Sequence, residues 1–201
     1  MRPSQICPLF LILAAAAFCA PAAAHERPTT TPAAQFLQGT LEQAFDLVRP
    51  PMASEANEDL IVLIERAMDW PSLTRFAVGH YGTGLSVGGM GVVTARLEQQ
   101  LGLLARRAGT ELPTMTIAIH DMRINPDGTR QVLSTATVPK YGEVEVEWTL
   151  ARTQLGYRIA DIRAFGLTLR QFLRGWVASL IAAQGGDAAA VFGKRVGSSP
   201  Q

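Results

Sequence analysis

Cysteine and histidine are scarce in this sequence of 201 residues, which has two of the first and three of the second. Cys7 and Cys19 both lie in an N-terminal stretch with the pattern of a cleaved export signal, so the mature chain would hold no thiol. His25, His80 and His120 have no partner at the spacing of metal ligands. The sequence therefore predicts no metal site and no disulfide, and a stability that comes from its core.

Excess charge of either sign is also missing. The chain has 18 Lys and Arg against 17 Asp and Glu, a formal net charge of +1. Nucleic-acid binding depends on clustered basic charge, and attachment to anionic membranes depends on polybasic segments. The balance therefore predicts neither a nucleic acid nor a membrane surface as the partner.

The N-terminus has the pattern of a signal peptide. Arg2 supplies the positive end, residues 8–18 are apolar, and residues 22–24 form a small-residue cleavage site that ends at Ala24. A membrane anchor is the alternative, but it needs about 20 apolar residues, and Pro21 interrupts the run. We expect a signal peptide, a single domain and a disordered tail, over residues 1–24, 25–196 and 197–201.

Helical periodicity dominates the first half of the domain. Apolar side chains recur every three or four residues over 36–48, from about 54 to 68, and over 93–108. A shorter helix follows Asp69, whose side chain is expected to cap it. The glycines between residues 82 and 91 predict a loop.

After Pro113 the apolar period changes from 3.6 to 2, which predicts strands. The clearest strand is GEVEVEWTL, in which valine, tryptophan and leucine alternate with glutamate and threonine. Short turns, such as the one at Asn125–Gly128, separate the strands and predict an antiparallel meander with one buried face. Four strands are expected, over residues 115–124, 132–138, 143–150 and 157–164.

The last strand leads almost directly into a helix. Ile162 breaks the alternation that Tyr157 and Ile159 set, so we expect a β-bulge near Ala160. Gly166 is expected to form the corner, before a Thr168 N-cap and an apolar helical stripe. Helices folded onto one face of a curved four-stranded antiparallel sheet, with an apolar cavity between the layers, make the predicted fold α+β.

Two candidates for catalysis stand out. Residues 84–88 fit the G-x-S-x-G pattern of esterases around Ser86, but that motif needs a preceding strand and a later histidine, and only His120 follows. Asp161, at the expected bulge, is the candidate base of a small isomerase-like α+β enzyme, an alternative based on fold analogy alone. Neither candidate forms a complete catalytic set.

Large aromatic side chains come from many elements and have few polar partners. An ordinary core and a ligand cavity both account for such a set, and spacing does not distinguish them. The residues concerned are Phe36, Phe45, Trp70, Phe76, Trp148, Phe165, Phe172 and Trp176.

Several segments in order resemble one family. The stretch from Asp69 to Tyr81, DWPSLTRFAVGHY, resembles the aromatic-rich helix of the MlaC-like proteins, the periplasmic auxiliary components of toluene-tolerance ABC transporters. VEVEWTL, YRIADI and a G-x-[ST]-L-x4-R motif from Gly166 to Arg174 follow in the family's order. The resemblance covers residues 36–192, and Phe165 stands where the family usually has an acidic residue.

The resemblance implies a periplasmic, non-enzymatic protein that carries phospholipid between the outer and inner membranes, with the lipid as cargo and no cofactor. It implies two partners, a lipid-binding subunit of an inner-membrane ABC transporter and an outer-membrane lipoprotein complex. A hopanoid-associated branch of the family makes a sterol-like lipid the alternative cargo. Two acyl chains hold about 30 methylenes, whose exposure to water costs on the order of 20 kcal/mol, so transfer between membranes needs a carrier.

The lipid is expected to contact apolar side chains of the sheet and of three helices. Four of them, at the strand-to-helix corner, are predicted to form one wall of the cavity: Ile162, Leu169, Phe172 and Trp176. The full predicted set adds Phe76, Leu97, Leu101, Val146 and Trp148. Arg163, Arg170 and Arg174 are expected on the solvated surface.

Overall fold

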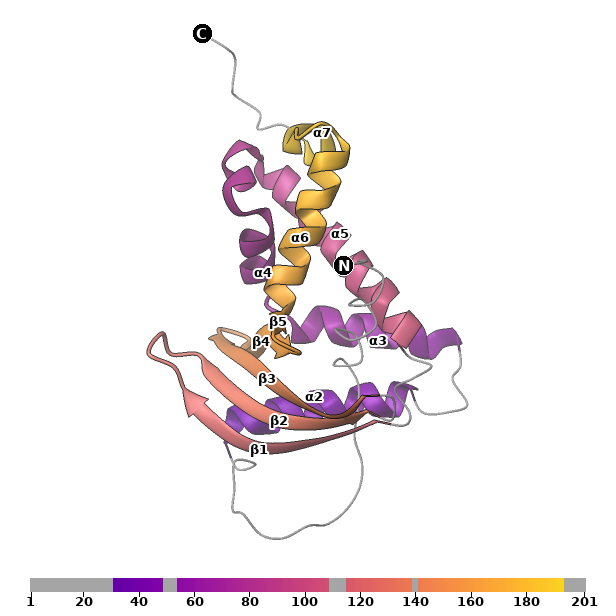
Figure 1. Ribbon diagram of the computed structural model, residues 1–201, viewed down its shortest axis with the longest axis vertical. Helices are drawn as coiled ribbons and strands as arrows, with labels where there is room; N and C mark the ends of the chain where they lie inside the picture. Colours follow the sequence, from indigo (N-terminus) through magenta and orange to yellow (C-terminus); the bar gives the residue numbers. More distant parts are fainter. Residues whose placement is uncertain (1–30, 49–53, 109–114, 139–140, 194–201) are drawn as a thin grey trace.

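The computed structural model describes residues 31–48, 54–108, 115–138 and 141–193 (Figure 1). The predicted signal peptide, residues 1–24, and the predicted tail, residues 197–201, lie outside these ranges. Within the described ranges, no helix combines the length and the apolar character that a membrane span requires.

The strands form one antiparallel sheet in which each strand pairs with the next along the chain. The sheet has five strands, which corrects the prediction of four. The extra strand has only two residues and pairs with β4, because the chain reverses at Phe165 and Gly166, whose φ angles are 54° and 75°. The strands are β1 (Thr116–Ile124), β2 (Arg130–Val138), β3 (Gly142–Thr153), β4 (Gly156–Ala164) and β5 (Leu167–Thr168).

Helices cover the inner face of the curved sheet and extend away from one edge of it, so the fold is α+β as predicted (Figure 1). Helix α2 lies across the sheet, and α3 lies beside α2. Helices α4 and α6 rise from the β4–β5 side, and α5 runs from α7 down to α3. The helices are α2 (Pro32–Val48), α3 (Ser54–Ala67), α4 (Trp70–Val78), the 3-10 helix η2 (Gly79–Gly84), α5 (Val87–Ala108), α6 (Leu169–Ala183) and α7 (Ala188–Phe192).

The predicted bulge in β4 is present. Asp161 pairs with Thr149 and Ile159 pairs with Leu150, so Ala160 is an extra residue in β4. The bulge lets Ile159 and Ala160, which are neighbours in the chain, both be buried. β1 has a second bulge, between Ile119 and Asp121, that the alternation in the sequence did not reveal.

The predicted helix caps are also present. The Asp69 carboxylate accepts a hydrogen bond from the Ser72 backbone N–H at 3.3 Å and caps α4. At α6, Thr168 and Gln171 form a capping box, in which each side chain accepts from the other residue's backbone N–H. These caps satisfy N–H groups that the first turn of a helix leaves unpaired, and they fix where α4 and α6 begin.

The predicted glycine-rich loop is wrong. Residues 79–84 form η2, and α5 begins at Val87 and takes up the remaining glycines. The Gly89 backbone N–H donates to the Ser86 hydroxyl at 2.9 Å, and α7 packs directly on Gly89. A Cβ at Gly89 would lie 2.9 Å from the Phe192 carbonyl oxygen, so the glycine permits close helix packing and does not mark a loop.

We expect two glycines of α5 to respond oppositely to alanine. Gly89→Ala should lower the free energy of unfolding because its Cβ meets the backbone of α7. Gly91→Ala should raise it by about 0.5–1 kcal/mol, because a Cβ there has no atom within 4 Å and alanine favours the helix. Urea unfolding of the two variants measures the difference, and equal effects would show that α7 does not pack on Gly89.

Candidate functional site

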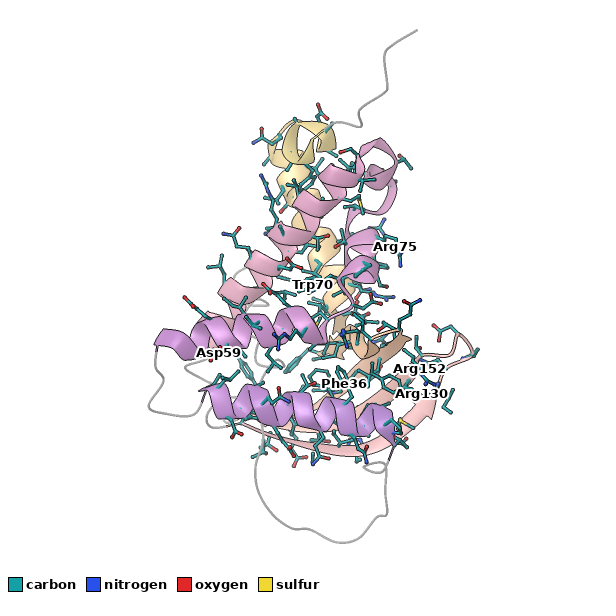
Figure 2. The ribbon with its side chains drawn as sticks, turned by 180° about the vertical axis from the view of Figure 1, so that it is seen from behind. Phe36, Asp59, Trp70, Arg75, Arg130 and Arg152 are labelled. Carbon is teal, nitrogen blue, oxygen red and sulfur yellow. The ribbon has the colours of Figure 1, made fainter. Side chains whose placement is uncertain are left out.

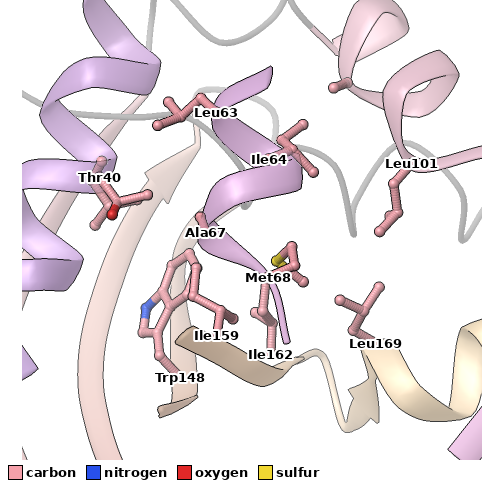
Figure 3. Close-up of a pocket in the computed structure, with 12 residues that line it drawn as sticks. Thr40, Leu63, Ile64, Ala67, Met68, Leu101, Trp148, Ile159, Ile162 and Leu169 are labelled. Atoms are coloured by element: carbon pink, nitrogen blue, oxygen red, sulfur yellow. The ribbon is translucent and has the colours of Figure 1, made fainter. Parts of the chain in front are cut away.

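A cavity of about 50 Å³ lies between the sheet and the helices (Figure 3). Its lining comes from α2, α3, β3, β4, α5, the start of α6 and the residue that follows α3. The lining residues are Thr40, Leu41, Leu63, Ile64, Ala67, Met68, Leu101, Ala105, Trp148, Ile159, Ile162 and Leu169.

The cavity lining is almost entirely apolar. Its one residue with a hydroxyl, Thr40, donates that hydroxyl to the Phe36 carbonyl oxygen at 2.8 Å. No lining residue is ionisable, and no group of acidic, histidine or cysteine side chains in the described ranges is suited to hold a metal ion. The chemistry of this surface therefore suits an apolar ligand, bound by exclusion of water.

Trp148 is the largest fully buried side chain of the described core and lines the cavity from β3. Its indole N–H donates to the Ser134 hydroxyl at 2.8 Å, and that hydroxyl donates to the Val146 carbonyl oxygen at 3.3 Å. Because an unpaired indole N–H would be costly at this depth, Ser134 fixes the orientation of the ring. The polar edge of Trp148 is thereby satisfied away from the cavity.

The corner between β4 and α6 is held by Asp161 and Arg170. The Asp161 carboxylate accepts from the backbone N–H groups of Ile162 and Arg170, at 2.9 and 3.0 Å. The Arg170 side chain donates to the Ala160 carbonyl oxygen at 3.0 Å and to the Ser72 hydroxyl at 2.8 Å. Arg170 is therefore half-buried, which corrects the expectation of a solvated side chain.

This bonding also bears on the alternative of Asp161 as a catalytic base. Burial raises the pKa of the Asp161 carboxyl above its ordinary value, against the lowering effect of the two backbone hydrogen bonds and of Arg170. The residue does not line the cavity, and its carboxylate already accepts two structural hydrogen bonds. The geometry supports a role for Asp161 in joining α6 to β4.

Four of the nine predicted lipid-contacting residues line the cavity: Leu101, Trp148, Ile162 and Leu169. Leu97 and Val146 are buried in the core outside the lining. Phe76, Phe172 and Trp176 are half-buried and also outside the lining. Whether any of the nine contacts a lipid stays a prediction.

The wall predicted at the corner is formed in part. Ile162 and Leu169 face the cavity, but the buried face of α6 continues through Leu173, Val177 and Ile181. Phe172 and Trp176 each precede a residue of this stripe by one position, about 100° around the helix, and therefore lie on its flank. The apolar surface of α6 is broader than the face that is buried, and the sequence pattern did not indicate which part of it would be buried.

Half of the lining comes from α2, α3 and Met68, which the sequence analysis did not assign to the site. Their residues there are Thr40, Leu41, Leu63, Ile64, Ala67 and Met68.

The end of α3 reaches the cavity because Met68 forms a β-bridge with Ile159, and the Asp69 backbone N–H donates to the Ile159 carbonyl oxygen at 2.9 Å. Ile159 and Ala105 also line the cavity and were likewise missed. The apolar stripes of both helices were visible in the sequence, but nothing in the stripes indicates which surface they face.

The G-x-S-x-G motif does not form a nucleophile elbow. A 3-10 helix precedes Ser86 in place of a strand, and the Ser86 hydroxyl accepts from the Gly89 backbone N–H at the start of α5. The serine acts as a helix cap.

No protein-family model matches the sequence, and no curated protein matches it. Among solved structures, the fold is similar to that of a phospholipid-binding protein from Ralstonia solanacearum, which was solved in complex with a phospholipid. The TM-score is 0.60 at 18% sequence identity, and the match covers 79% of this chain and 92% of that chain. The two proteins therefore share a fold over most of their lengths.

We expect Ser134→Ala to lower the free energy of unfolding by about 1–3 kcal/mol, because it leaves the buried Trp148 indole N–H without an acceptor. The double variant Ser134→Ala with Trp148→Phe lacks that N–H. The losses of unfolding free energy in the two single variants should therefore sum to more than the loss in the double variant. Urea unfolding of the two single variants and the double variant tests this coupling. Strict additivity would show that the hydrogen bond does not contribute.

The raised pKa of Asp161 predicts a specific pH dependence. In the unfolded chain the carboxyl ionises at its ordinary pKa, whereas burial opposes ionisation in the folded chain. The wild type should therefore lose stability relative to Asp161→Asn as the pH rises from the ordinary pKa through the raised one. Asparagine keeps an oxygen acceptor for the two backbone N–H groups, so the comparison isolates the charge. Unfolding free energies of both proteins at pH 3.5 and pH 7 measure this difference. A wild type that gains stability relative to Asp161→Asn as the pH rises would contradict a raised pKa for Asp161.

Proposed function

We propose that this protein is a non-enzymatic lipid carrier that binds a phospholipid through its acyl chains in the cavity between the sheet and α2, α3, α5 and α6. The observation that carries the proposal is the cavity itself, which is lined by apolar side chains and by one threonine whose hydroxyl is already hydrogen bonded. The fold shared with a phospholipid-binding protein supports the same ligand class.

The proposed cavity has to widen to take its cargo. Its volume of about 50 Å³ is well below the roughly 300–1,000 Å³ of common ligand pockets. Thr40, Leu63 and Ile64 are only half-buried, so the cavity approaches solvent between α2 and α3. We infer that acyl chains enter there and separate these helices from the sheet.

The biological setting is part of the proposal. The signal-peptide pattern supports export to the periplasm, and the resemblance to MlaC-like proteins supports a shuttle between outer and inner membranes. The partners proposed on that basis are a lipid-binding subunit of an inner-membrane ABC transporter and an outer-membrane lipoprotein complex. A hopanoid-type lipid is the alternative cargo, because an apolar cavity suits acyl chains and a sterol-like ring system equally well.

Filling the cavity should displace the lipid. Ala67→Phe places a ring in the cavity from α3, and we expect the lipid per folded molecule to fall by at least half. Ala118→Phe is the matched control, because Ala118 is exposed on β1 and lies outside the lining. Native mass spectrometry of both variants and the wild type, purified gently after periplasmic expression, measures the lipid, and thermal unfolding checks the fold.

Two results would contradict the proposal. One is a wild-type protein that carries no lipid after gentle isolation. The other is an Ala67→Phe variant that folds and keeps as much lipid as Ala118→Phe.

A further inference from the structure

The inner face of the sheet changes from apolar to cationic at one end of its strands. Trp148 and Ile159 line the cavity, and Leu150, the next inward residue of β3, is fully buried opposite Ile159. Arg130 pairs with Leu150 from β2, and Arg152 is the following inward position of β3. Both arginines therefore stand on the face that lines the cavity, one and two steps beyond it.

Helix α2 supplies an aromatic side chain at the same end of the cavity. Thr40 lines the cavity, and Phe36 lies one turn before it. The Phe36 ring packs against Tyr157 of β4, with ring centroids 6.4 Å apart and both residues half-buried. Tyr157 in turn pairs with Arg152. The aromatic pair thus forms the border between the apolar lining and the two guanidinium groups.

The two arginines are close enough to act on one ligand. They are diagonal neighbours on adjacent strands, a relation that places Cα atoms roughly 7–8 Å apart and leaves long side chains within reach of each other. Figure 2 shows both at the same end of the sheet, with Phe36 on the helix that crosses it. Their mutual repulsion would be relieved by an anion between them.

No acidic side chain neutralises this pair in the described part of the chain. The ion pairs there join Arg123 to Asp121 and Arg163 to Glu147. Arg130 donates one hydrogen bond, to the Gly128 carbonyl oxygen, and leaves most of its donors available. The carboxylate of the adjoining turn, at Asp127, is already bonded to the backbone N–H and the hydroxyl of Thr129.

We propose that Arg130 and Arg152 form a binding site for the phosphodiester of a lipid whose acyl chains occupy the cavity. The inference rests on the proposed function and adds to it a position and a chemistry for the head group. Arg152 lies four positions after Trp148 along β3, about 13 Å away, a span suited to the glycerol backbone and the start of the acyl chains. Guanidinium groups bind phosphate oxygens through paired hydrogen bonds, so the site selects phospholipids over uncharged lipids.

The test compares two double variants that remove the same charge. Arg130→Gln with Arg152→Gln removes the proposed site. Arg123→Gln with Arg158→Gln is the control, because these arginines lie on the neighbouring strands β1 and β4, at the same end of the sheet but on its outer face. Each protein is equilibrated with vesicles that contain equal amounts of phosphatidylglycerol and diacylglycerol with identical acyl chains, and mass spectrometry then measures both lipids on the recovered protein.

We expect the wild type and the control to carry phosphatidylglycerol in preference to diacylglycerol. Removal of Arg130 and Arg152 should lower that ratio roughly 10- to 100-fold, while the total lipid per protein stays within about twofold. An unchanged ratio, or a control that loses the preference equally, would overturn the head-group site but not the proposed function as a lipid carrier. A wild type that takes up neither lipid would overturn both proposals.

Discussion

The bulge at Ala160 is the constraint on which the arrangement of the helices depends. A bulge frees backbone groups from the ladder of a sheet, and here two consecutive carbonyl groups accept hydrogen bonds from outside the sheet. The Ile159 carbonyl receives the Asp69 backbone N–H, which fixes the junction of α3 and α4, and the Ala160 carbonyl receives the Arg170 side chain of α6. Asp161 completes the junction by accepting the backbone N–H of Arg170. Three helices are therefore attached to three consecutive residues of one strand.

That attachment explains why a cavity lies where it does. Residues on either side of the bulge, Ile159 and Ile162, both point inward, and the helices held at the bulge supply Met68 and Leu169 to the same space. The attached ends keep these walls in place, whereas the lining from the middle of α2 and α3 has no hydrogen bond to the sheet among the described contacts. A cavity with one fixed side and one side held by apolar contact is suited to a flexible apolar cargo, because apolar contacts are non-directional and reform at different separations.

The side chains on the inner face of the sheet also change in character from one end of the strands to the other. This face runs from an apolar lining, through the half-buried rings of Phe36 and Tyr157, to the guanidinium groups of Arg130 and Arg152. This order of apolar, aromatic and cationic surface matches the order of acyl chain, glycerol and phosphate along a phospholipid. The near-zero net charge of the whole sequence gave no sign of it, because total charge does not report where like charges gather.

The sequence by itself determined helices α2 to α6, the four longer strands and their antiparallel order, the bulge at Ala160 and the caps at Asp69 and Thr168, because each depends on residues close together in the chain. It could not show that Gly89 lies inside a helix, since that glycine is required by α7, about a hundred residues away. Nor could it place Arg170 against Ser72 or choose which side of the α6 stripe faces the cavity. Only the tertiary structure decided these features, because a periodic pattern records that a side chain is buried but not which distant surface buries it.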